Sequence, residues 1–238
     1  MEKNIYGYDP ETVERATASS FPALMSKVYL WMTLALAMTG LTAVYVAQNE
    51  SLIYSIATNR GLFFGLIIAE LALVFILSAR IMKMSFPMAG LMFAAYSVLY
   101  GVTLSFIFLA YTASSIASTF FITAGTFGAM TLFGLFTKRN LSTVGRFLFM
   151  ALIGLIIASV VNMFWANSPL YWIITYAGVF IFCGLTAYDT QKMKEILYHS
   201  QDEGDTNLMK IALMCSLSLY LDFINLFLYL LRIFGDRK

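Results

Sequence analysis

Seven long apolar stretches constrain this chain more than any other feature of its sequence. Each contains about 20 residues or more with few charged side chains, the length that a helix needs to cross the hydrocarbon core of a bilayer. The stretches show no alternation of apolar and polar residues, so helices are favoured over strands. We therefore predict seven transmembrane helices, at residues 28–47, 61–79, 86–110, 116–137, 147–165, 170–188 and 208–234.

The composition indicates lipid rather than water as the solvent of the folded chain. Of 238 residues, 60% are hydrophobic and 12% are charged, whereas soluble domains average about 45–50% apolar and about 25% charged residues. The net charge of +2 gives no nucleic-acid footprint, so no nucleic acid partner is expected. We expect an all-α integral membrane protein with residues 1–27 as a cytoplasmic N-terminal tail and residues 28–238 as one seven-helix membrane domain.

The distribution of Lys and Arg predicts the orientation, because cytoplasmic connections are enriched in both. Eleven of the 15 basic residues fall in the N-terminal tail and in every second connection, and the other four fall on the opposite side. The N-terminus is therefore expected in the cytoplasm and the C-terminus outside. The C-terminal tail is itself basic, so a re-entrant last helix with both ends cytoplasmic stays open as an alternative.

Ionisable side chains within the spans are costly and therefore mark candidate functional positions. Glu70 lies at the centre of the second stretch and Asp222 near the centre of the seventh. The seventh stretch also carries a polar stripe at spacings of 4, 3, 4 and 3, which places its members on one helical face: Ser218, Asp222, Asn225, Tyr229 and Arg232. A polar face in a bilayer turns toward other helices or water, so we expect the seventh helix at the centre of the bundle. Hydrogen bonding between helices is the structural alternative for this stripe.

Two segments in the last third of the chain carry a specific resemblance. The sequences GLTAYDTQ (184–191) and SLYLDFINLF (218–227), followed by LLRIFG (230–235), resemble the signature stretches of the Bax inhibitor-1, or transmembrane Bax inhibitor motif, family. The resemblance implies a bacterial member with a central seventh helix and a pH-sensitive calcium leak. It implies a gating pair at Asp189 and Asp222, with an arginine latch for which Arg80 is the nearest candidate. Glu70 and Arg232 match the family's second-helix acid and seventh-helix base, and Asn225 completes the candidate ion pathway.

The physical chemistry of two neighbouring carboxyl groups fits this implied role. Two carboxyls in a low-dielectric site cannot both ionise cheaply, so Asp189 and Asp222 would share a proton and would repel one another once it is lost. Their oxygens are also hard ligands suited to transient calcium binding. Residue counting leaves a mismatch, because Asp222 lies farther from the intervening turn than Asp189, by about 9 Å along the helix axes.

Other functions remain open at this stage. A non-conducting membrane regulator that binds a membrane protease or a cell-death or stress partner is the main alternative, and proton-coupled solute transport is another. An intramembrane aspartyl protease would place a Gly-x-Gly-Asp motif at Asp222, which Leu-Tyr-Leu precedes here, so no enzyme activity is expected. We expect no cofactor beyond calcium as the permeant ion, partners limited to the lipid bilayer, calcium and a membrane protein, and a location in the bacterial plasma (inner) membrane.

Overall fold

The computed structural model describes residues 10–200 and 204–238. These residues are almost entirely helical, and within them the β pairing is confined to an isolated bridge between Tyr111 and Arg237. The helices, in chain order, are α1 (Pro10–Gln48), α2 (Glu50–Thr58), α3 (Arg60–Arg80), the 3-10 turn η1 (Ile81–Lys83), α4 (Phe86–Leu104), α5 (Ile107–Ala110), α6 (Ala113–Phe136), α7 (Ser142–Trp165), α8 (Ser168–His199) and α9 (Asp205–Phe234).

Seven segments in this part of the chain are long and apolar enough to cross a membrane, which confirms the predicted number of spans. They are Pro22–Gln48, Arg60–Lys83, Phe86–Ala110, Ala113–Phe136, Ser142–Trp165, Ser168–His199 and Asp205–Phe234. The clearest differences from the prediction lie in the first and sixth spans. Helix α1 begins at Pro10, eighteen residues before the expected start at Val28 and within the predicted N-terminal tail, and α8 continues eleven residues beyond the expected end at Tyr188 to His199. The short helix α2 was not expected; Asn49 caps its start by accepting a hydrogen bond from the Leu52 amide at 3.2 Å.

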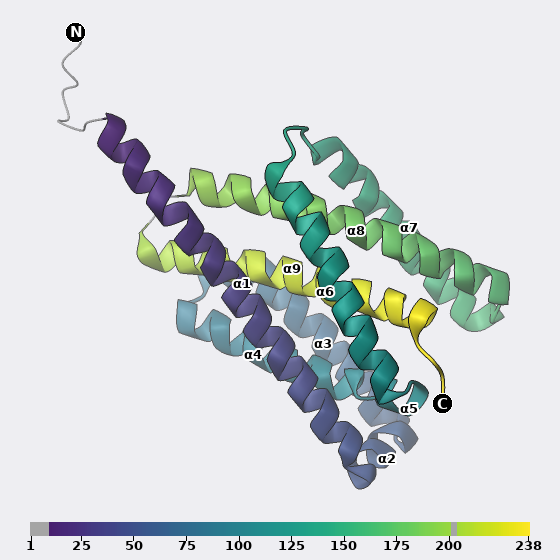
Figure 1. Ribbon diagram of the computed structural model, residues 1–238. Helices are drawn as coiled ribbons and strands as arrows, with labels where there is room; N and C mark the ends of the chain where they lie inside the picture. The colour runs from purple at the N-terminus through teal and green to yellow at the C-terminus, as the bar shows by residue number, and fades with distance from the viewer. Residues whose placement is uncertain (1–9, 201–203) are drawn as a thin grey trace.

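The seventh span, α9, occupies the centre of the bundle, as predicted. In its most apolar stretch 72% of the residues are buried, against 11% for α3 and 6% for α7. Helices α1, α4, α6 and α8 pack directly against α9, while α3 packs chiefly on α4 and α7 on α8. Figure 1 shows α9 running through the molecule between α1 and α8, with α6 crossing in front of it.

Side-chain hydrogen bonds tie α9 to the helices around it. The Tyr220 hydroxyl lies 2.8 Å from Thr39 Oγ1 on α1, and Thr39 donates to the Ser97 carbonyl on α4 at 2.9 Å. One turn earlier, the Ser216 hydroxyl donates to the Val28 carbonyl at 2.8 Å. Because the bilayer core offers no water to satisfy these groups, such bonds between helices fix how α1, α4 and α9 pack.

The C-terminal residues lie at the end of the bundle opposite to the basic connections. The Arg237 guanidinium donates to the Tyr171 hydroxyl at 3.0 Å, and Lys238 Nζ donates to the Phe108 carbonyl at 2.7 Å. Helix α9 runs without a break from Asp205 to Phe234, and Figure 1 places the start of α1 and the C-terminus at opposite ends. An unbroken α9 in this position favours a full last span over a re-entrant last helix.

Candidate functional site

Asp189 lies on α8 where this helix faces α9. Its half-buried side chain lines a small cavity of about 90 Å³ together with Lys192 from its own helix and Cys215 and Ser218 from α9. Asp189 therefore sits well inside α8 rather than closing the sixth span, because this helix continues to His199.

Asp222 is buried on α9, with 5% of its surface exposed. Its Oδ2 atom is enclosed and has no hydrogen-bond partner within the described part of the chain. Such a group in the middle of a bilayer is costly unless a proton, a water molecule or a cation satisfies it. The predicted inward position of Asp222 is confirmed, and its unsatisfied oxygen makes it the strongest candidate for a functional carboxyl.

The two carboxyls occupy successive turns of the contact between α8 and α9. Gly178 of α8 lies so close to Tyr229 of α9 that an added methyl group would be 2.6 Å from the ring. This contact sets the register of the two antiparallel helices and places Asp189 opposite Ser218. Asp222 is then one turn farther along α9, about 6 Å by helix rise. The groups interact electrostatically, but no hydrogen bond joins them among the described residues. The offset is smaller than the value of about 9 Å obtained by counting residues from the turn, and the direct pairing of the carboxyls that the family resemblance implies is not seen among the described residues.

The cation beside this pair is a lysine that the sequence analysis did not select. Lys192 is three residues after Asp189 on α8, a spacing that places both side chains on one face, and it attracts the Asp189 carboxylate. Arg80, the candidate latch, is exposed at the end of α3, a helix that packs chiefly on α4. The structure thus does not bring Arg80 to the aspartates.

Arg232 and Asn225 take other positions on the α9 stripe. The Arg232 guanidinium lies 5.0 Å from the centre of the Tyr229 ring and 5.7 Å from that of Tyr171, toward the C-terminal end of α9. Asn225 donates to the Leu221 carbonyl of its own helix at 2.7 Å. Both side chains are half-buried. Of the stripe residues Asp222, Asn225 and Arg232, only Asp222 therefore faces the bundle interior fully. The deepest face of α9 is mainly apolar because several helices enclose it.

Glu70 forms a second polar centre, on α3. Its side chain is buried, with 8% of its surface exposed, and it accepts a hydrogen bond from the Thr103 hydroxyl on α4. The rings of Tyr96, Tyr100 and Tyr220 pack against one another, with centroids 5.9 to 6.5 Å apart, and all three lie within electrostatic range of Glu70. Tyr96 and Tyr100 are four residues apart and share one face of α4, but their contact with Tyr220 joins segments far apart in the sequence, so sequence reasoning missed the cluster.

Comparison with known proteins shows the family to which this architecture belongs. Residues 22–238 match the family described as inhibitor of apoptosis-promoting Bax1. The Inner membrane protein YbhL of Escherichia coli K12 is 52% identical over 214 residues, covering 90% of this chain and 92% of that protein. Uncharacterized proteins of Borreliella burgdorferi and Deinococcus radiodurans are 43% identical over 214 residues (90% and 92% covered) and 39% identical over 224 residues (94% and 95% covered).

A seven-span helical membrane protein with a central last helix is the class that the fold defines. The chain belongs to the Bax inhibitor-1 family, as the signature segments around Asp189 and Asp222 indicated. Its seven apolar helices and the relatives named as inner membrane proteins identify it as an integral protein of the bacterial inner membrane.

Proposed function

We propose that this protein is a channel, not an enzyme, that lets calcium leak across the inner membrane and responds to pH through Asp189 and Asp222. The observation that carries the proposal is the buried Oδ2 atom of Asp222, which has no partner among the described residues. A carboxyl oxygen in this position is a site for a proton or for a hard cation. The neighbouring carboxyl of Asp189, which lines a cavity, supplies the second oxygen-bearing group.

Protonation of the pair is the proposed control. With one proton bound to either carboxyl, repulsion between the two groups is small and α8 and α9 stay packed. Loss of that proton leaves two like charges in a poorly solvated site, where their repulsion is strong. The half-buried Ser218 and Asn225 extend a polar surface to either side of Asp222, and they support an ion path along this face of α9.

Calcium flux from liposomes tests the proposal directly. The full chain is reconstituted with calcium inside, and efflux is measured as the external pH is varied, with Asp189→Asn and Asp222→Asn as test variants. Each removes one titrating group and keeps most hydrogen bonding, so each should flatten the pH response. Asp205→Asn is the matched control, because Asp205 is an exposed acid in the first turn of α9.

The outcomes separate a channel from a regulator. A flattened response in both test variants with a normal response in the control supports the proposal. Unchanged midpoint and slope in both test variants would make the pair structural. Absence of calcium efflux from the wild-type protein would favour a non-conducting regulator that acts on a membrane protein partner.

We also propose that the basic end of the bundle faces the cytoplasm. The support is the split of 11 basic residues against 4, because Lys and Arg are retained on the cytoplasmic side. Arg139→Cys places a thiol in the exposed connection between α6 and α7, and an impermeant reagent added to intact cells should leave it unlabelled. Strong labelling would reverse the orientation. Lys238→Cys, at the opposite end, is the positive control.

A further inference from the structure

A basic pocket lies at the end of α6, where the chain turns into α7. The pocket has a volume of about 410 Å³, and its lining includes Lys138, Arg139 and Lys194, with Glu195 as the acidic member. Within the described part of the chain, the side chains of Lys138 and Arg139 form no ion pair or hydrogen bond. The pocket therefore presents cationic groups that are available to a ligand at the edge of the membrane-spanning region.

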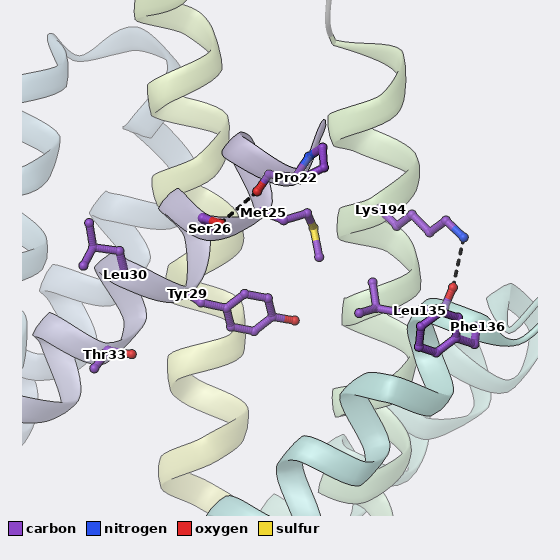
Figure 2. Close-up of a pocket in the computed structure, with 9 residues that line it drawn as sticks. All are labelled: Pro22, Met25, Ser26, Tyr29, Leu30, Thr33, Leu135, Phe136 and Lys194. Carbon is purple, nitrogen blue, oxygen red and sulfur yellow. Dashed lines mark hydrogen bonds between the residues drawn. The ribbon is translucent and has the colours of Figure 1, made fainter. Parts of the chain in front are cut away.

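Hydrogen bonds from α8 hold this connection in place. The Leu141 amide donates to Gln191 Oε1 at 2.8 Å, while Gln191 Nε2 donates to the Arg139 carbonyl at 2.9 Å. Lys194 Nζ donates to the Leu135 carbonyl near the C-terminal end of α6 at 2.9 Å, as Figure 2 shows. The cations of the pocket are thus carried on an ordered segment anchored to α8.

An apolar groove begins where the basic pocket ends. Lys194 borders both, and the groove, of about 770 Å³, lies between α1 and the C-terminal end of α6. A second groove of about 720 Å³ continues it toward the membrane centre, sharing Tyr29 and Thr33 and reaching Phe223 of α9. The stretch of α1 from Pro22 to Thr33 alone extends about 16 Å, roughly half of a hydrocarbon core of about 30 Å.

Tyr29 forms part of the wall of the groove. Figure 2 shows Tyr29 projecting from α1 into the space beside Leu135 of α6. The Tyr29 hydroxyl faces Thr131 and Thr190, and the hydroxyls of Tyr29 and Thr131 are fully enclosed between the helices. The groove therefore exposes the apolar part of the Tyr29 ring, while its hydroxyl is held among the helices.

We propose that the basic pocket and the adjoining groove together bind one anionic phospholipid. Lys138 and Arg139 contact the headgroup phosphate, and an acyl chain lies along α1 past Tyr29 and Thr33. Basic pockets between transmembrane helices on the cytoplasmic side suit anionic headgroups, and the apolar groove suits the chain that follows. A protein segment would require carboxylates and an apolar run at the same spacing, whereas anionic lipids of the surrounding leaflet already have both parts. This inference is independent of calcium conduction.

Lipid retention by the purified full chain tests the headgroup half of the site. The chain in detergent micelles is titrated with phosphatidylglycerol or phosphatidylethanolamine, and bound lipid is counted by native mass spectrometry. Each cation near an anionic headgroup is worth about fivefold in affinity, so Lys138→Gln with Arg139→Gln should weaken phosphatidylglycerol binding by about 25-fold. Lys83→Gln with Arg146→Gln removes the same charge from exposed positions at the same end that line neither cavity, and it should leave binding unchanged.

A second pair of variants tests the acyl-chain half. Thr33→Trp places a large ring in the groove from an exposed position that lines it, and it should weaken phosphatidylglycerol binding several-fold. Val160→Trp, on the exposed surface of α7, should not. Retention of the lipid in the presence of millimolar glycerol phosphate or inorganic phosphate supports a lipid site, whereas displacement by either would show a simple anion site. Equal binding of both lipids, or equal loss in both charge variants, would overturn the proposal.

Discussion

Glu70 on α3 and Asp222 on α9 are both buried carboxyls within membrane spans, yet their surroundings differ. Glu70 lies on an outer helix and accepts a hydrogen bond from Thr103, beside a cluster of tyrosines. Asp222 lies on the central helix, and its Oδ2 atom has no partner among the described residues. A satisfied carboxyl is compatible with a structural role, whereas an unsatisfied one on a tightly packed helix is more readily explained by function. Burial alone therefore does not distinguish the two roles.

Substitutions that crowd the packing should separate the two regions by the largest difference in the free energy of unfolding. Gly178 on α8 faces Tyr229, whose ring would lie 2.6 Å from an added methyl group, whereas nothing lies within 4 Å of one at Gly65 on α3. Gly178→Leu should lower the free energy of unfolding by about 3 kcal/mol through overpacking, and Gly65→Leu should change it little. Reversible unfolding in mixed micelles measures both. Equal losses would mean that α3 packs as tightly as α8.

Replacement of Asp222 and of Glu70 by leucine should change the free energy of unfolding in opposite directions. Asp222→Leu removes an unsatisfied buried group and should raise the free energy of unfolding by about 1 kcal/mol, while Glu70→Leu leaves the Thr103 hydroxyl without its acceptor and should lower it by about 1 kcal/mol. The same micelle unfolding experiment applies, and the matched size of the replacement makes each variant the other's control. If Asp222→Leu is the more damaging variant, a partner absent from the described contacts holds this carboxyl.

Sequence reasoning succeeded where a single physical requirement acts on a long segment. The bilayer thickness fixes the length of each apolar run, so the seven spans were predictable, and the polar stripe together with the family resemblance indicated a central seventh helix. It failed where short segments or individual contacts decide. Helix α2 is too short to leave a span signal, and the hydrogen bond between Tyr220 and Thr39 has no periodicity to reveal it.

The candidate site was predictable in its residues but not in its geometry. Counting residues indicated different depths for Asp189 and Asp222 but overestimated the offset, at about 9 Å against about 6 Å by helix rise. It could not show that Arg80 is exposed on an outer helix, since this depends on how α3 packs. Lys192 could have been found, because its spacing of three from Asp189 places both on one face of a helix. It was overlooked because candidates were taken from the interiors of the predicted spans, and Lys192 lies beyond the expected end of the sixth span.

Glu70 remains a candidate for the ion pathway, and a conservative variant tests this against a structural role. Glu70→Gln keeps the shape and the acceptor for Thr103 but removes the negative charge from the membrane centre. If calcium passes this level, efflux from liposomes should fall several-fold at every pH, while the shape of the pH response stays as in the wild type. Unchanged efflux across pH would make Glu70 a structural acid, and a flattened pH response would extend the proton-sensing site beyond Asp189 and Asp222.

The smallest expected effect is that of removing the Thr103 hydroxyl, which donates a hydrogen bond to Glu70, whereas Asp222 Oδ2 has no such donor among the described residues. Thr103→Val removes the donor and keeps the side-chain shape, and hydrogen bonds between membrane helices average about 0.6 kcal/mol. The free energy of unfolding should fall by about that amount. Thr126→Val is the control, because the Thr126 hydroxyl bonds only to the Ile122 carbonyl of its own helix, so its loss leaves the contacts between helices intact. A loss well above 2 kcal/mol for Thr103→Val would indicate that Glu70 is then left as unsatisfied as Asp222, and that the Thr103 bond, rather than the position of α3, separates the two carboxyls.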